Sequence, residues 1–67
     1  MNIAPETPKQ QMKDSDMIFK QISSGDFDDF KMAEQAVMML YAMDKSISRS
    51  GISHALGRLK RFYAMSD

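Results

Sequence analysis

The feature that most constrains the fold is residues 26–43, part of the longest stretch without glycine, proline or serine. On a helical wheel, one side of this stretch collects Phe27, Phe30, Ala33, Val37, Leu40 and Tyr41. Further apolar residues extend the surface towards the back, namely Met32, Ala36, Met39 and Met43. A helix that is apolar over most of its circumference needs burial on more than one side. The rest of so short a chain can cover one side, so we expect this second set to contact a partner.

The size of the chain favours the same conclusion. A chain of 67 residues buries a modest core, and such domains commonly need a disulfide, a metal or oligomerisation for stability. The sequence has no cysteine, and a lone histidine, His54, cannot form a zinc site by itself. We therefore expect no cofactor or metal, and a homodimer. Eight methionines are many for this length, and we expect them to serve both core and interface.

Secondary-structure signals divide the chain into a tail and one helical domain. Residues 1–11 contain Pro5 and Pro8 and lack an apolar pattern, which predicts a disordered tail. Residues 12–67 form the domain, with helices near 14–24, 27–43 and 49–63 and no strand. The predicted fold is all-α: the second and third helices form a hairpin, and the N-terminal helix docks on it.

Cap residues set these boundaries. Asp14 is the expected N-cap of the first helix and Asp26 of the second, because a side-chain oxygen accepts from the first free backbone N–H groups. Ser48 or Ser50 caps the third helix, and Gly25 ends the first. Gly57 lies inside the third helix, where glycine costs roughly 1 kcal/mol against alanine. Either the helix tolerates this cost, or Gly57 permits a close backbone approach.

The charges separate along the chain although the net charge is zero. Residues 1–44 carry four lysines against eight acidic residues, a net charge of −4, and residues 45–67 carry five basic residues against one acidic, a net charge of +4. Segment 46–61 resembles the turn and recognition helix of a helix-turn-helix protein. Its candidate nucleic-acid contacts are Arg49, Ser50, Ser53, His54, Arg58 and Arg61. In the alternative interpretation these basic residues form a solvated face and His54 simply faces solvent.

A longer segment, from Ser15 to about Ser66, resembles the YmgB/AriR family of small enterobacterial biofilm and acid-resistance regulators. The matching features are the 23–25 turn, the Gln35-Ala36-Val37 core with Glu34 where the family has glycine, and the polar turn over 44–48. The resemblance implies a non-enzymatic, all-α homodimer that connects to a two-component phosphorelay, or a weak DNA binder that reads shape. Its implied partners are a second copy, a sensor kinase or response regulator, and in the alternative DNA.

The sequence shows no constellation with catalytic or metal-binding spacing. Asp26, Asp28 and Asp29 lack the central glycine and later glutamate of a calcium loop. We expect no enzyme activity. No apolar run reaches the length of a membrane span, and the absence of cysteine suits a reducing compartment, so we expect a cytoplasmic bacterial regulator that acts by protein docking. The alternative is a transcriptional regulator that binds DNA through its basic third helix.

Overall fold

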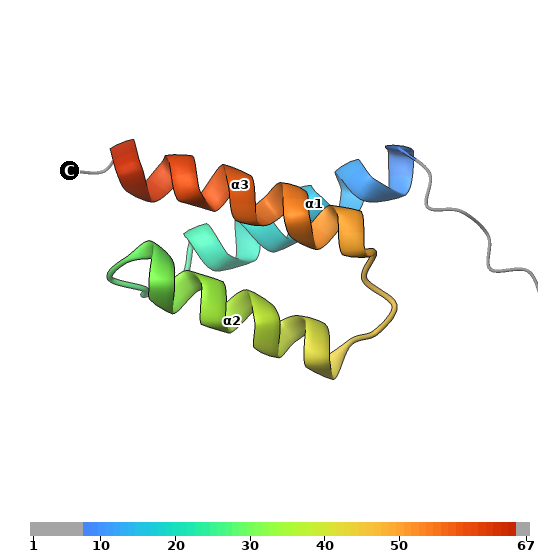
Figure 1. Cartoon of the computed structure of the whole chain (residues 1–67), viewed down its shortest axis with the longest axis horizontal. Helices are drawn as coiled ribbons and strands as arrows, with labels where there is room; N and C mark the ends of the chain where they lie inside the picture. Colours follow the sequence, from blue (N-terminus) through green and yellow to red (C-terminus); the bar gives the residue numbers. More distant parts are fainter. Residues whose placement is uncertain (1–7, 66–67) are drawn as a thin grey trace, which may run out of the picture.

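The computed structural model describes residues 8–65 as three α-helices, with no strand among them. These are α1 (Pro8–Ser23), α2 (Phe30–Met43) and α3 (Arg49–Met65). Figure 1 shows α1 and α3 running in the same direction and α2 running opposite to both. The all-α, three-helix prediction is confirmed. The largest helix–helix contact joins α1 to α3, so the N-terminal helix packs mainly on α3 rather than across an α2–α3 pair.

The first helix begins earlier than predicted. It starts at Pro8 instead of near Asp14, so residues 8–11, which we assigned to a disordered tail, are helical. Proline suits the first helical position because its missing N–H has no intrahelical partner there, and the lysines and glutamines that follow are good helix formers. Asp14 is therefore an interior residue of α1 and not its cap. The remainder of the predicted tail, residues 1–7, lies outside the described residues.

The second helix begins later than predicted, because Asp29 caps it instead of Asp26. The Asp29 backbone is extended, and its carboxylate accepts a hydrogen bond from the Met32 N–H at 3.0 Å. Phe27 lies in the connection before α2, where it packs against the core. A Cβ on Gly25 would lie 2.6 Å from the Phe27 ring, so any other residue at this position requires the ring to shift.

The core is aliphatic and draws on all three helices and the α2–α3 connection. Its buried members are Ile18, Ile22, Ala33, Val37, Ile47, Ile52, Ala55 and Leu59. Of the α2 residues expected inside the subunit, Val37 is fully buried, while Phe30, Leu40 and Tyr41 are half-buried against the core. Burial of one large aliphatic side chain contributes about 1.5–3 kcal/mol, so this short list is the main source of stability.

A glycine and a serine bring the start of α3 against α1. A Cβ on Gly51 would lie 2.5 Å from the Asp14 Cβ, so the two helices approach closely at this point. The Ser48 N–H donates to Asp14 Oδ2 at 2.8 Å, and the Gly51 N–H donates to Ser48 Oγ at 3.0 Å. Ser48, one of the two predicted caps, therefore caps α3, and Asp14 of α1 satisfies a further backbone donor there.

Candidate docking surface

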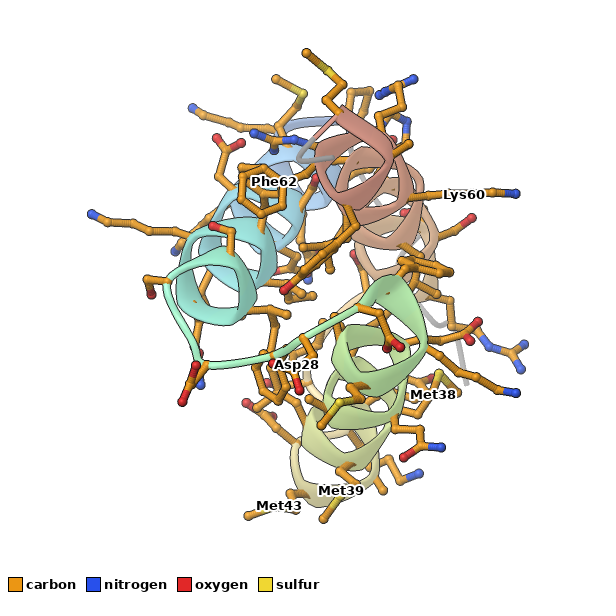
Figure 2. All side chains as sticks on the ribbon, turned by 90° about the vertical axis from the view of Figure 1, so that its left-hand side faces the viewer. Asp28, Met38, Met39, Met43, Lys60 and Phe62 are labelled. Carbon is orange, nitrogen blue, oxygen red and sulfur yellow. The ribbon has the colours of Figure 1, made fainter. Side chains whose placement is uncertain are left out.

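One side of α2 presents an apolar surface that neither of the other helices covers. We call it the methionine face and define it as Met32, Ala36, Met39 and Met43. Met32, Met39 and Met43 are 45%, 66% and 82% exposed, and Ala36 is half-buried at the inner edge. Figure 2 shows Met39 and Met43 at the edge of the molecule, pointing away from α1 and α3. The surface that the sequence assigns to a partner is therefore uncovered in the single chain.

The spacing of the methionine face suits another helix as its occupant. Its members follow one another at intervals of four, three and four residues, which places them in one stripe along α2. This interval pattern is that of the apolar seam by which two helices pack together. Ala36 is the smallest member, and a small residue among long, flexible methionines leaves room for a side chain of the opposite helix.

The described methionines are absent from the core. All seven are exposed, by fractions from 41% at Met17 to 83% at Met65. The expectation that methionines serve the core as well as an interface is therefore wrong for these residues. The interior is already filled by isoleucine, valine, leucine and alanine side chains from the helices and the α2–α3 connection, so the methionines remain outside.

A shallow groove separates α2 from α3 on another side of the molecule. Its volume is about 260 Å³, and it is lined by Met38, Tyr41, Arg49, Ile52, Ser53 and Leu56. The Lys45 ammonium lies 5.1 Å from the centroid of the Tyr41 ring. Sequence reasoning missed this groove, because it placed Tyr41 in the core and gave Arg49 to nucleic acid. Only the way α2 packs on α3 brings these residues together.

The six candidate nucleic-acid residues all lie on α3, but their surroundings differ. Arg58 turns towards α1, where its Nη1 lies 2.6 Å from Asp16 Oδ1 and donates to Ser15 Oγ at 3.2 Å. Its guanidinium also lies 4.5 Å from the centroid of the Phe19 ring. Arg49 and Ser53 line the groove instead. The remaining three are His54 and Arg61, which are exposed, and Ser50, which is half-buried.

The connection between α2 and α3 carries a charged hydrogen-bonded turn. Asp44 Oδ1 accepts from the Ser46 hydroxyl at 2.5 Å and from the Ser46 N–H at 3.0 Å. The bond from the Ser46 hydroxyl, followed by that from its N–H, lowers the pKa of the Asp44 carboxyl from its ordinary value. These bonds hold the turn by which the chain leaves α2 and enters the buried pair Ile47 and Ser48.

The described residues contain no group of three or more histidine, cysteine or acidic side chains placed to hold a metal ion. Within residues 8–65, no helix combines the length and apolarity that crossing a membrane requires. Comparison of the chain with protein-family models, with curated proteins and with solved structures gives no match. The resemblance to the YmgB/AriR family therefore stays a prediction from the sequence.

Proposed function

We propose that the chain is a small non-enzymatic regulator that works by docking, and that its methionine face pairs two copies into a homodimer. The observation that supports this most is the exposure of Met39 and Met43, at 66% and 82%, on a helix whose opposite side packs in the core. An exposed apolar stripe on so small a domain is costly in water unless a partner covers it. The occupant to which we commit is a second copy.

The regulatory target follows from the resemblance to the YmgB/AriR family. We propose that the dimer acts as a connector that binds a sensor kinase or response regulator and so influences biofilm or stress-response genes. The alternative, DNA binding through α3, has less support, because the Arg58 charge is met by Asp16 within the subunit. A connector binds its protein target with an affinity that salt only partly alters, whereas DNA affinity falls steeply as salt rises.

The test of the dimer is Met39→Lys, measured by sedimentation equilibrium over a wide range of protein concentration. Burial of an unpaired ammonium in a dry interface is costly, so we expect the dimer to weaken at least tenfold. The helical circular dichroism should remain, because Met39 is outside the core. The matched control is Met65→Lys, the same change at an 83% exposed methionine at the end of α3, which should leave the dimer intact.

A wild-type chain that sediments as a folded monomer at every concentration would contradict the homodimer. A pull-down from the native host tests the target. Recovery of a kinase or response regulator, lost on Met39→Lys but not on Met65→Lys, is the expected result. Recovery of promoter DNA alone, with an affinity that drops steeply with salt, would replace docking by the DNA-binding alternative.

A further inference from the structure

The described methionines all lie at the surface of the protein. The seven described methionines are between 41% and 83% exposed, and the core contains only isoleucine, valine, leucine and alanine. The chain has no cysteine, so thioethers are its only sulfur groups. An oxidant that reacts with sulfur therefore changes the surface of this protein without entering its packed interior. Oxidation of a buried methionine disrupts a protein core, and the described residues place no methionine in the core.

We infer that the thioethers of the methionine face are a modification site, and that their oxidation by a peroxide switches docking off. The inference rests on the proposed function, since it requires that face to be the docking surface. In the reaction, the thioether sulfur attacks the terminal peroxide oxygen and the O–O bond breaks. With hydrogen peroxide, one oxygen is transferred to the sulfur and the other leaves as water with both protons. The sulfur is oxidised by two electrons and carries the new S–O bond of a sulfoxide.

The consequence follows from the polarity of the product. A sulfoxide oxygen is a strong hydrogen-bond acceptor, and a docked apolar face offers it no donor. Burying such a group without a partner is unfavourable, so each sulfoxide at Met39 or Met43 should weaken pairing about tenfold. The fold should persist, because the core residues on α2, Ala33 and Val37, contain no sulfur and lie on another side of the helix.

Pairing should in turn protect the site. Met39 and Met43 are open in the single chain but should be covered when two methionine faces meet, whereas Met65, 83% exposed in the single chain, lies at the end of α3 outside that face. The reactive species is thus the free subunit. Peroxide therefore oxidises the monomer and prevents it from pairing again. The chain has no thiol, so it cannot reverse the reaction by itself. Reversal needs an external dithiol-dependent reductase.

The first test follows sulfoxide formation at each methionine by mass spectrometry, with hydrogen peroxide, at protein concentrations below and above the dimer midpoint. Oxidation of Met39 and Met43 should slow at the high concentration in proportion to the fall in the monomer fraction. Oxidation of Met65 should keep the same rate and serves as the internal control. Equal rates at both concentrations for all three residues would overturn the protection that we infer.

The second test compares two triple variants after peroxide treatment. Met32→Leu/Met39→Leu/Met43→Leu keeps an apolar face without sulfur, because leucine replaces methionine at little cost. Its matched control is Met12→Leu/Met17→Leu/Met65→Leu, which removes three exposed methionines elsewhere. After treatment, the dimer affinity of the wild type and of the control should fall about tenfold or more. Both should keep their helical circular dichroism. The triple variant of the face should keep its dimer.

The outcomes separate this inference from the proposed function. If the untreated wild type forms no dimer at any concentration, the homodimer and the switch both fail. If the dimer forms but survives complete oxidation of Met39 and Met43, only the switch is overturned. If oxidised wild type unfolds while the triple variant of the face does not, the loss of pairing is a loss of fold, and the inference is wrong in that case too.

Discussion

Gly51 and Gly57 lie six residues apart on the same helix, yet their surroundings are opposite. A Cβ on Gly51 would meet Asp14 Cβ at 2.5 Å and Ser48 Oγ at 2.8 Å. A Cβ on Gly57 would meet nothing within 4 Å. In the single chain, the helix therefore tolerates the energetic cost of Gly57, which permits no close contact. The close backbone approach occurs at Gly51 instead.

Replacing Gly51 and Gly57 by alanine, one at a time, should change the free energy of unfolding in opposite directions. Gly51→Ala should lower the free energy of unfolding by about 1–3 kcal/mol, because α1 must move away and the Asp14–Ser48 hydrogen bond lengthens. Gly57→Ala should raise it by up to about 1 kcal/mol through helix propensity. Urea denaturation followed by circular dichroism measures both. Equal effects of the two changes would show that helix propensity alone governs the positions.

The elements α1 and α3 are joined across their length by different interactions. Near the start of α3 the contact is Gly51 against Asp14, and towards its end the Phe19 and Phe62 rings meet edge to face at 5.7 Å. Between them Arg58 reaches Asp16, Ser15 and the Phe19 ring. These contacts hold α1 against α3 from Asp14 to Phe19.

Arg58→Ala tests this contact at the scale of the helix pair. The ion pair is partly open to solvent, so with the contact to the Phe19 ring we expect a loss of about 1 kcal/mol in the free energy of unfolding. The matched control is Arg61→Ala, an exposed arginine one turn later, which should change it by less than about 0.5 kcal/mol. Adding Asp16→Ala to Arg58→Ala should cost little more. Additive losses from Asp16 and Arg58 would contradict their pairing.

At the scale of the whole molecule, the proposed homodimer should make the free energy of unfolding depend on association. Among residues 8–65, eight hydrophobic residues are buried, and five of these are isoleucine or leucine. Such a core leaves a narrow margin of stability in a domain of this size. If a second copy covers the methionine face, as we propose, it binds only the folded state and stabilises that state by mass action.

Thermal unfolding should accordingly depend on protein concentration. For the wild type we expect the Tm to rise by about 3 °C for each tenfold increase in concentration, from mass action and the usual entropy of unfolding of a domain this small. Met39→Lys should unfold at a Tm that does not change with concentration, and Met65→Lys should behave as the wild type. Scanning calorimetry at three concentrations measures this. A constant Tm for the wild type would argue that the chain folds and works alone.

The sequence by itself determined the helices and the surplus of apolar surface. Apolar spacing and the turns around Gly25 and Ser46 predicted three helices, because periodicity and cap chemistry are local properties. It also placed Met32, Ala36, Met39 and Met43 on the part of α2 that the subunit leaves open. That prediction needed only the geometry of one helix and the shortness of the chain.

Tertiary structure alone decided which polar residues meet and where the helices begin. The local sequence around Asp14 predicts a cap of its own helix, yet its carboxylate accepts a hydrogen bond from the backbone N–H of Ser48, 34 residues away. The local sequence around Arg58 predicts a basic surface, yet Arg58 forms an ion pair with Asp16. Neither contact has a local signal, because each depends on the direction in which α1 lies along α3. That direction follows from the packing of the aliphatic core and the close approach at Gly51, which only the folded chain brings about.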